Sequence, residues 1–438
     1  MENNNISLDD KIYGLSLIWK EAEYNFPFWK RLNNLDWDNA YRESLIKIME
    51  TKTIREYYLE LCRFISLLRD GHTKVWFPIE LKKEVGKLPI WISIVNDKWY
   101  ITNKDSSLNI SLYDEVIAIN NISIQEYLSE RIYPYCWHEK VDSLEWDVNS
   151  LIPFVEYKTD IVITTSKDSF TVKATNNEIK WNPKIKLSSR EPLIEIFSSK
   201  THKIFLTKDN IAIIIIPTFM EDSLKDEFYK NMDKLKDCSG YIVDIRDNGG
   251  GNSNNADSVV QAFLEGEFIN STDKKMIHIG TYKSWGKNMN LEKLNQNNEL
   301  FKKVYDISKR QYYEYSSYKS FYEECPFSLK GTLIVLENQR TGSSAENMLV
   351  CLDSQKRAII MGTPSCGSTG NPLSFDLPGG GGCRICTRWE TYPDGREFIN
   401  IGVIPHIRAS LSIDDIRDRH DSVLDKAIYQ MRKELQRN

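Results

Sequence analysis

Two polar stretches, each directly after a strongly apolar run, hold the residue types best suited to chemistry. The first is "TGSSAE" at residues 341–346, which follows "GTLIVLEN" and precedes apolar residues at helical spacing. Ser343 and Ser344 therefore stand at the start of a predicted helix, where free N–H groups and the helix dipole favour developing negative charge. The same residues also fit ordinary helix capping, with Glu346 closing a capping box.

The second stretch is the triple glycine Gly249 to Gly251 in "VDIRDNGGGN", where an apolar strand ends and a helix follows. Glycines adopt backbone angles closed to other residues, so main-chain N–H groups can face a ligand. An oxyanion site can be built from backbone in this way, although a tight turn that needs one glycine fits as well. A nucleophilic serine beside such a turn would attack a carbonyl carbon and form an acyl-enzyme.

A serine hydroxyl needs a base, and a histidine could serve. His72 in "DGHTKV" has a distinct place in the pattern. It alone among the six histidines follows a helix-ending glycine and opens a predicted strand. A lone histidine is more often a packed or exposed residue, so its assignment depends on the serine being active. Lys356 belongs to the end of the predicted helix after Ser343, where we expect a solvated side chain.

The elements that must position these residues change character along the chain. Residues 8–26 and 53–70 carry apolar residues at helical spacing, which predicts a helical N-terminal region that ends near Gly71. Alternating apolar residues and turn signals then predict a small β-rich module. Its elements are a hairpin turning at Asn96 and Asp97, a strand at 115–120, a turn at Asn120 and Asn121, a helix opening near Ser123, and strands at 160–166 and 169–174.

From about residue 200 the sequence alternates between apolar runs of strand length and helical patterns. This alternation predicts a mostly parallel sheet covered by helices, and hence a multidomain α/β protein. The predicted strands lie at 210–219, 240–248, 331–338 and 357–363, and the predicted helices lie at 223–235, at 254–264 and after Ser343.

Length and composition limit the possible functions. The 438 residues are 41% hydrophobic and 27% charged, which indicates a globular protein of two or three domains. A formal net charge of -5 gives no basic footprint for nucleic acid, and no apolar run reaches membrane-spanning length. The first residues show no secretion signal, so the sequence predicts a cytoplasmic protein.

The eight cysteines are scattered, and the expected state is reduced and mostly buried. Only Cys383 and Cys386 form a CxxC pair, and no second pair at zinc spacing accompanies it. A redox function for this pair is disfavoured because no helix pattern follows it. We expect neither a metal nor a cofactor.

Five stretches, taken in order, resemble the C-terminal-processing peptidase and tricorn family of serine peptidases. They are "RDGHT", "DIRDNGGG", "TGSSAE", "GTPSCGSTG" and "YPDGREFINIGVIPHI". The resemblance covers nearly the whole chain. It implies a helical N-terminal region at residues 1–80, a PDZ-like module at 81–180, and an α/β catalytic core of the crotonase/ClpP-like spiral type at 181–438.

The resemblance also implies roles for single residues. Ser343 would be the nucleophile, and the backbone N–H groups of Ser344 and Gly250 would form the oxyanion hole. Processing peptidases use a lysine as the base, but Ser368 stands at that position here. The chain therefore resembles the tricorn-like branch, which uses a histidine, and the matching histidine is His72.

The residue that would orient the histidine is less sharply defined. The glutamate position of tricorn falls on Ile399 here, and Glu397 lies two residues earlier on the same face of an extended strand. Glu390 is the alternative. Tricorn also has a serine before its histidine, where this chain has Gly71, and His406 replaces an aspartate at what we expect to be a structural position.

These observations predict a serine peptidase that hydrolyses a peptide or protein through an acyl-enzyme on Ser343. The main alternative is a non-catalytic peptide- or ligand-binding protein on the same scaffold, and a third is an acyltransferase or esterase. The PDZ-like module would bind extended peptide ends by strand addition. In that module Asp114 matches the family pattern, whereas Tyr113 and Asn121 replace its glycines. The patterns do not indicate an oligomeric state.

Overall fold

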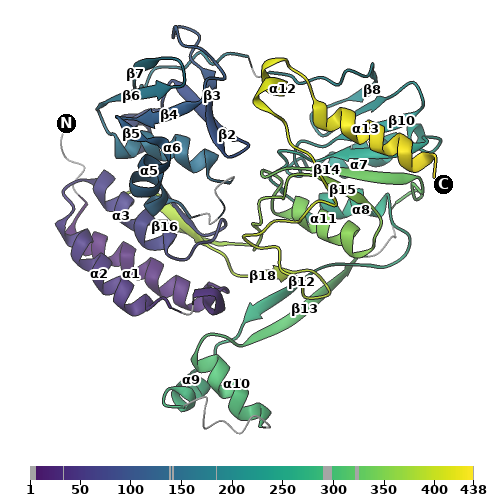
Figure 1. Ribbon diagram of the computed structural model, residues 1–438. Coiled ribbons are helices and arrows are strands. Elements are labelled where there is room, and N and C mark those ends of the chain that lie inside the picture. Colours follow the sequence, from purple (N-terminus) through teal and green to yellow (C-terminus); the bar gives the residue numbers. More distant parts are fainter. Residues whose placement is uncertain are drawn as a thin grey trace.

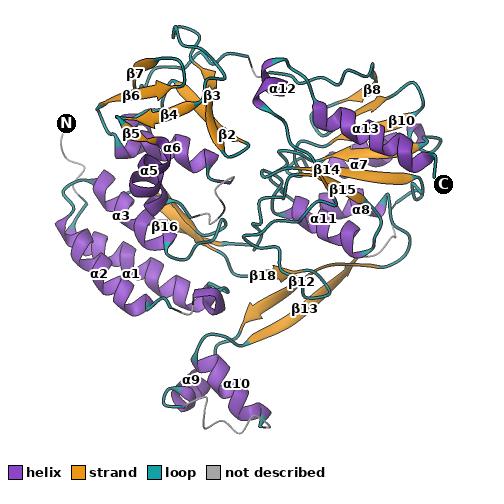
Figure 2. Cartoon of the chain, viewed as in Figure 1, coloured by secondary structure: helices purple, strands orange, loops and turns teal. Residues whose placement is uncertain are grey.

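The computed structural model describes residues 6–32, 34–137, 140, 143–183, 185–289, 298–320 and 325–437. It has a mixed α/β architecture (Figures 1 and 2). In Figure 1 the N-terminal helices and the small β-rich module lie on one side, and a large sheet with its helices lies on the other. An arm made of two long strands and two helices projects below them.

The N-terminal region is helical, as the spacing of apolar residues predicted. Each helix begins at a side chain that accepts a backbone N–H, and Thr53 and Glu56 form a complete capping box. The buried faces of these helices carry large side chains, including Trp37 and Phe64, whose rings stack at 4.2 Å between centroids. The helices are α1 (Leu8–Asn25), α2 (Trp37–Glu50) and α3 (Ile54–Ser66), with a short 3-10 turn at Trp29–Leu32.

The β-rich module follows, and both of its predicted turns are present. Asn96 and Asp97 join β2 to β3, and Asn120 and Asn121 join β4 to β5, all four with positive φ angles that asparagine and aspartate tolerate. A four-stranded sheet has the order β5-β4-β6-β7. The strands are β2 (Ile90–Val95), β3 (Lys98–Lys104), β4 (Val116–Ile119), β5 (Ile122–Ser123), β6 (Asp160–Thr165) and β7 (Ser169–Lys173).

Helices of the module were only partly predicted. The helix at Ser123 begins there, but its regular part is a single turn, which continues as a wider turn at Leu128–Ile132 and a 3-10 turn at Tyr133–Tyr135. Two further helices were not predicted. The regular helices of the module are α4 (Ile79–Val85), α5 (Ile124–Tyr127) and α6 (Glu145–Val155).

The large sheet has seven strands in the order β19-β15-β14-β11-β10-β9-β8. Its pairs from β10 to β19 are parallel, whereas β8 and β9 are antiparallel additions at one edge, so the predicted mostly parallel sheet is confirmed. The strands are β8 (Ile194–Ser198), β9 (Lys203–Leu206), β10 (Ile211–Ile215), β11 (Gly240–Asp244), β14 (Thr332–Glu337), β15 (Ile359–Gly362) and β19 (Ile407–Arg408).

Both faces of this sheet are covered, because alternate residues of its strands join different buried clusters. Ile211 and Ile213 of β10 pack in one cluster with residues of α13, while Ala212 and Ile214 pack in the cluster that contains residues of α8 and α11. The helices of this region are α7 (Leu224–Asn231), α8 (Ser253–Gln261), α11 (Ser344–Ser354), α12 (Ile413–Arg417) and α13 (Ser422–Leu435), with a 3-10 turn at Met232–Lys234.

Two features join regions that are distant in sequence, and neither was predicted. A hairpin of β16 (Leu373–Leu377) and β17 (Gly381–Ile385) reaches the N-terminal region, where β17 pairs with β1 (Lys74–Trp76). The projecting arm pairs with β18 beside the core. Its elements, with β18, are β12 (Phe268–Met276), α9 (Gly280–Gly286), α10 (Glu299–Ser308), β13 (Tyr313–Ser320) and β18 (Trp389–Thr391).

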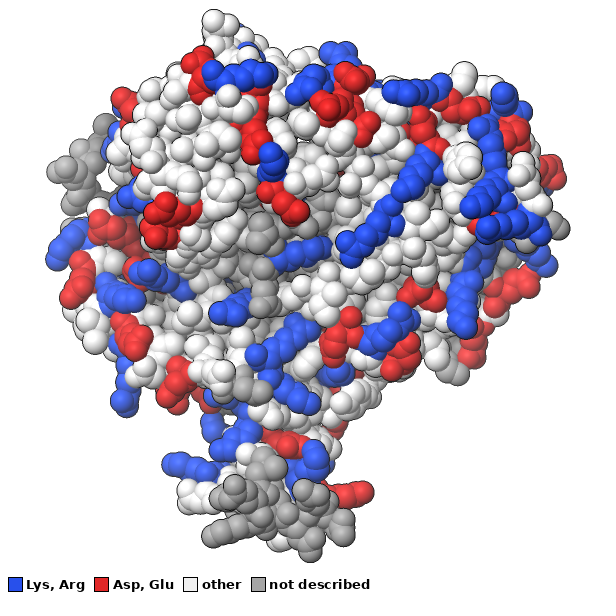
Figure 3. Space-filling view, viewed as in Figure 1, with Lys and Arg blue, Asp and Glu red and all other residues white. Residues whose placement is uncertain are grey.

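Within the described ranges, none of the helices combines the length and the apolar composition that crossing a bilayer requires. Acidic and basic side chains are interspersed on the face drawn in Figure 3.

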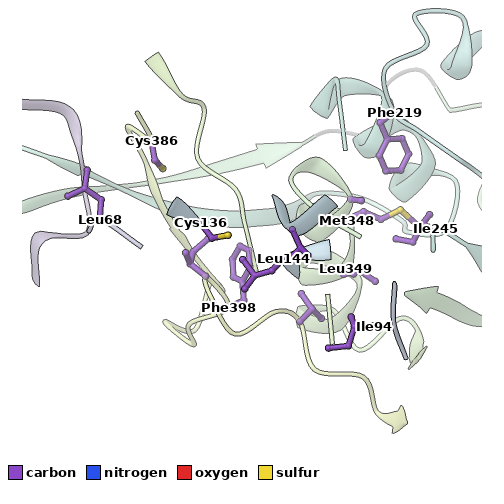
Figure 4. Close-up of a cluster of buried hydrophobic side chains, with 14 of the residues drawn as sticks. Leu68, Ile94, Cys136, Leu144, Phe219, Ile245, Met348, Leu349, Cys386 and Phe398 are labelled. Atoms are coloured by element: carbon purple, nitrogen blue, oxygen red, sulfur yellow. The ribbon is translucent and has the colours of Figure 1, made fainter. Parts of the chain in front are cut away.

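A single hydrophobic cluster runs through the N-terminal helices, the module and the core. Figure 4 draws part of it, with Met348 and Leu349 of α11, Ile94 of β2 and Leu68 after α3 among the labelled side chains. The regions therefore pack against one another through shared apolar side chains rather than through a linker. This packing brings loops from different regions to the start of α11.

Candidate active site

Ser343 stands at the sharp turn between β14 and α11. It is half-buried, and its φ of 55° lies in the left-handed region that residues with a side chain rarely adopt. Its backbone N–H donates to the carbonyl oxygen of Ser368 at 2.9 Å, and its own carbonyl oxygen accepts the N–H of Glu346 at 2.8 Å. Strained backbone angles of this kind cluster at functional sites, although Ser343 also forms a capping box with Glu346.

The triple-glycine turn lies directly against this serine. A Cβ atom placed on Gly250, whose φ is 95°, would come within 2.7 Å of Ser343 Cβ and 2.9 Å of Ser344 N. Only glycine therefore allows the two loops to approach this closely. The Gly250 N–H donates to Asn248 Oδ1 at 2.9 Å, so a side chain of the same turn is its acceptor in this structure. A Cβ on the neighbouring Gly249 would meet no atom within 4 Å.

Ser344 is the first residue of α11 and is buried, with a side-chain hydroxyl that has no hydrogen-bond partner in the described part of the chain. N–H groups in the first turn of a helix have no intrahelical partner, so the Ser344 N–H is placed to serve an external acceptor. A Cβ atom added to Gly250 would lie 2.9 Å from Ser344 N, so the two residues lie next to each other.

His72 reaches this site from the N-terminal region. Its Nδ1 atom lies 2.5 Å from the hydroxyl oxygen of Ser368, a buried residue whose carbonyl oxygen accepts the Ser343 N–H. His72 and Ser343 are thus connected through one intervening residue. This is a close approach of residues that lie far apart in the sequence.

The unpredicted hairpin explains how His72 is held there. Residues Lys74–Trp76 pair with β17, with Lys74 opposite Arg384. The hydroxyl of Thr73 donates to Asp70 Oδ2 at 2.6 Å and accepts the Cys386 N–H at 2.9 Å. The residues that follow His72 are therefore held by β17 and by Cys386, which lies just after β17.

Glu346 organises the loop that carries Ser368. Its fully buried carboxylate accepts the backbone N–H groups of Gly367 at 2.5 Å and Ser368 at 2.9 Å, the hydroxyl of Ser365 at 2.5 Å, and the Ser343 N–H at 3.2 Å. Burial raises its pKa to about 7, and the hydrogen bonds from Ser365, Gly367 and Ser368 oppose that rise. The predicted capping residue is therefore the hub between the nucleophile turn and the 365–368 loop.

Asn400 holds the same loop from another direction. Its backbone N–H donates to the Gly367 carbonyl oxygen at 2.7 Å, and its side-chain amide donates to the Arg69 carbonyl oxygen at 2.8 Å. Arg69 lies just before the His72 segment. Asn400 therefore links the end of the N-terminal helices to the 365–368 loop.

Glu397 and Glu390 lie elsewhere in the region. Glu397 accepts from Trp389 Nε1 at 2.6 Å and Lys274 Nζ at 3.0 Å, with Arg31 at 3.5 Å. Glu390 is buried and accepts from the Asn347 amide at 2.6 Å. Each carboxylate therefore accepts hydrogen bonds from residues other than His72. A role for either in orienting His72 stays a prediction.

Other residues singled out in the sequence occupy structural positions. Lys356 is exposed beyond the C-terminal end of α11, roughly 16 Å along the helix from its start. His406 accepts the Ile360 N–H at 2.9 Å. Cys383 and Cys386 are both buried thiols, and burial raises their pKa well above the ordinary value, which disfavours reactivity. Among the described residues, no group of three or more His, Cys, Asp or Glu side chains is placed to hold a metal.

A cleft with a volume of about 1660 Å³ runs between the module and the core. Trp91, Trp146 and Asn149 line its module side, and Asn338 and Arg340 of the nucleophile loop line its core side. Neither Ser343 nor His72 is among its lining residues. The cleft therefore adjoins the candidate site but does not contain it.

Sequence reasoning missed three positioning residues. Ser368 was noted only as the residue at a lysine position, Glu346 only as a capping residue, and Asn400 not at all. The signal for Glu346 was present, because a charged residue on the apolar side of a helix must find buried donors. The other two act through long-range contacts that no local pattern reports.

Comparison with known proteins identifies the core. The sequence pattern of peptidase family S41 matches residues 210–409. A carboxy-terminal-processing protease of Bartonella bacilliformis is 27% identical over 176 residues, which are 40% of this chain and 31% of that protein. The match thus spans about a third of the length of that relative. The resemblance predicted from the five motifs is confirmed for residues 210–409.

Solved structures with the same fold extend over the whole chain. Mature CPAF in complex with lactacystin superposes with a TM-score of 0.74 at 15% identity, over 98% of this chain and 99% of that one. A putative peptidase from Parabacteroides merdae gives a TM-score of 0.56 at 16% identity, over 98% and 97% of the two chains. At these identities the likeness shows the fold, which includes the N-terminal region and the module as well as the core.

Proposed function

Because residues 210–409 form a domain of peptidase family S41, we propose that the chain is a serine peptidase that hydrolyses peptide bonds through an acyl-enzyme on Ser343. One observation carries the proposal: the backbone of Gly250 lies against Ser343 Cβ and Ser344 N at a strained helix start. Because of that contact, the Ser343 hydroxyl and a potential oxyanion donor lie close enough to act on one substrate carbonyl group. A simple capping serine would not require it.

His72 is the proposed general base. Its ring rests on Ser368, which is itself hydrogen-bonded to the Ser343 backbone. In the first step the Ser343 O–H bond breaks as its oxygen bonds to the substrate carbonyl carbon, and the proton moves to the imidazole. The protonated imidazole then gives this proton to the leaving amine, and water completes the hydrolysis by the reverse roles.

The two proposed oxyanion donors differ in whether their N–H group already has an acceptor. The Ser344 N–H lies in the first turn of α11, where it has no intrahelical acceptor and adds the effect of the helix dipole. The Gly250 N–H would have to exchange Asn248 Oδ1 for the substrate oxygen. Glu397 keeps its proposed orienting role only in a state in which it exchanges Trp389 for His72.

For the three regions, we propose the division at residues 1–80, 81–180 and 181–438. Two long-range bridges support the limits of the module, Lys87 with Thr175 and Asp105 with Trp181, because they close the segment on itself. Its hairpins and the helix α6 are consistent with a PDZ-like module that accepts a peptide strand. Full-length protein should then bind peptides with a free carboxyl end, and binding unchanged by amidation of that end would count against this mode.

Hydrolysis of a fluorogenic peptide library tests the nucleophile. Ser343→Ala should abolish turnover while the circular dichroism spectrum stays unchanged. Ser344→Ala should keep much of the activity, because its proposed contribution is a main-chain N–H. Complete loss in Ser344→Ala with activity retained in Ser343→Ala would reverse the assignment. An enzyme that cleaves ester substrates but no amides would favour the esterase alternative.

The base is tested by a matched pair of variants. His72→Ala should lower kcat/KM by on the order of a thousandfold, whereas Lys356→Ala should change it little, because Lys356 is exposed at the far end of α11. For an imidazole base, kcat/KM should rise with pH through about 6 to 7 and then level. Near-normal turnover in His72→Ala would remove the histidine from the mechanism.

A non-catalytic binding protein on this fold is the remaining alternative. Specific peptide binding without any turnover, and without covalent labelling of Ser343, would support it.

A further inference from the structure

Among the described residues, the hydroxyl of Ser368 has one hydrogen-bond partner, and that partner is the ring of His72. The distance between Ser368 Oγ and His72 Nδ1 is 2.5 Å. The side chain is buried, so solvent cannot readily replace the imidazole as its partner. A buried serine whose side chain is hydrogen-bonded to a candidate base calls for an explanation.

The backbone of Ser368 is fixed on both sides of that side chain. Its N–H donates to Glu346 Oε2 at 2.9 Å, and its carbonyl oxygen accepts the Ser343 N–H at 2.9 Å. Both partners belong to the nucleophile turn. The backbone of Ser368 is therefore fixed relative to Ser343. Its hydroxyl, which contacts the imidazole, has a set position as a result.

We propose that Ser368 is a positioning residue for His72, which accepts the Nδ1–H so that Nε2 is left as the base. This inference rests on the proposed function, since it assigns a partner to the proposed base. A neutral imidazole carries one N–H, and a hydroxyl can either accept from a protonated ring nitrogen or donate to a bare one. In the proposed arrangement Ser368 Oγ accepts from Nδ1. With Nδ1–H donated to Ser368, the lone pair lies on Nε2.

The same hydroxyl also fits the next step. When the Ser343 proton moves to Nε2, both ring nitrogens carry protons, and Ser368 Oγ can only accept from Nδ1. Because it is neutral, it adds less stabilisation to the imidazolium than a carboxylate partner would. The hydroxyl would thus serve in the place where many serine peptidases use an acid.

The test combines a spectroscopic and a kinetic measurement on the full-length chain. The first is nitrogen NMR of protein labelled with ¹⁵N-histidine, with the His72 signals assigned by their loss in His72→Ala. At a pH where the ring is neutral, the native protein should show His72 as the Nδ1–H tautomer. In Ser368→Ala the nitrogen shifts should move toward the other tautomer. Ser374→Ala, the same change on an exposed residue of β16, should leave them unchanged.

The second measurement is peptide hydrolysis. Ser368→Ala should lower kcat by on the order of tenfold with KM unchanged, because a neutral hydrogen bond to the base is lost and no substrate contact is. Ser368→Thr, which keeps the hydroxyl, should recover kcat, and circular dichroism should confirm that each variant folds.

The two measurements separate the two claims. An Nε2–H tautomer in the native protein, or His72 shifts identical in Ser368→Ala, would overturn the proposal whether or not the chain hydrolyses peptides. Absence of hydrolysis with the expected tautomer would instead overturn the proposed function and leave the contact standing. Loss of hydrolysis in Ser368→Ala together with covalent labelling of Ser368 in the native protein would make Ser368 the nucleophile, and that result too would overturn its positioning role.

Discussion

At the scale of single residues, two buried glutamates near the nucleophile turn have opposite surroundings. Glu346 accepts hydrogen bonds from four groups, whereas neither carboxyl oxygen of Glu337, at the end of β14, has a partner among the described residues. Burial raises the pKa of Glu337 well above its ordinary value, with the charge of Glu346 acting in the same direction. Burial therefore disfavours the charged form of both glutamates, and only at Glu346 do hydrogen-bond donors oppose that effect.

Replacing each glutamate by methionine should separate these situations. Glu337→Met removes an unsatisfied polar group and should raise the free energy of unfolding by about 1–3 kcal/mol. Glu346→Met leaves four donors without their acceptor and should lower it by at least as much. Chemical denaturation of both variants checks the pair. A Glu337→Met variant less stable than the native protein would show that its carboxyl has a partner after all.

The titration of Glu346 also sets a pH dependence of stability. Its folded pKa of about 7 is above the ordinary value of 4.5, so the folded chain holds this proton more tightly than the unfolded chain. The stability that protonation contributes is present below the unfolded pKa and is lost as pH rises through about 7. Relative to Glu346→Gln, the free energy of unfolding of the native protein should therefore fall by up to about 3 kcal/mol from pH 5 to pH 8. A difference that rises with pH would have the wrong sign for this account.

At the scale of elements, the approach of the glycine turn to the start of α11 is the contact that builds the site. The turn leaves β11, and the serine follows β14, which is the neighbouring parallel strand. Parallel neighbours end at the same edge of a sheet, so loops after them meet there. A Cβ atom at Gly250 would clash with Gly342 and Ser343, so the glycine permits that approach.

Matched alanine substitutions in the turn test this contact. Gly250→Ala would place a Cβ 2.7 Å from both the Gly342 carbonyl oxygen and Ser343 Cβ, at a φ of 95°, so the turn must move away. We expect kcat/KM to fall on the order of a hundredfold, the size associated with a lost oxyanion donor. Gly249→Ala meets no atom within 4 Å and should change activity little. Similar kinetics for the two variants would mean that the close approach is not needed.

The elements that were predicted from the sequence are those with a distinct local pattern of apolar or turn-forming residues. The apolar strands β10, β11, β14 and β15, the helix after Ser343 and both asparagine turns of the module are present as expected. The hairpin β16–β17 was not predicted, because its partner strand β1 lies about three hundred positions earlier and is only three residues long. Without that pairing the sequence alone could not place His72.

The candidate site follows the same division. The types of residue at positions 72, 250 and 343 stand out in the sequence because each interrupts an apolar pattern. Their mutual geometry, including the contact of His72 with Ser368, depends on where the 365–368 loop folds back. Long-range loop packing of this kind leaves no periodic trace in the sequence.

At the scale of the whole molecule, polar contacts join the module to the loop that carries Ser343. Arg340, three residues before Ser343, donates to Glu145 of α6 at 2.6 Å, and Glu145 also accepts from Trp91 Nε1 at 2.8 Å. Lys140 of the module donates to the Pro364 carbonyl oxygen at 2.9 Å in the loop before Ser368. The cleft between module and core is thus spanned by polar contacts to both loops of the site.

A double-mutant cycle on Glu145 and Arg340 measures this fastening. Glu145 is 6% exposed at its side chain, but Arg340 is 40% exposed, so solvent screens part of the interaction. We expect a coupling free energy of about 0.5–2 kcal/mol in chemical denaturation. The exposed pair Glu80 and Lys83 on α4 should show no measurable coupling. A cycle on Glu145 and Arg340 that closes without coupling would contradict a role in holding the module.

The central claim is that Ser343 is a nucleophile activated by His72, and covalent labelling tests it most directly. Full-length protein is treated with a serine-directed fluorophosphonate, and the modified residue is mapped by peptide mass spectrometry. The account predicts a single label on Ser343, absent in Ser343→Ala and formed on the order of a hundredfold or more slowly in His72→Ala. A label on Ser344 or Ser368, or labelling of Ser343 at the native rate in His72→Ala, would contradict it.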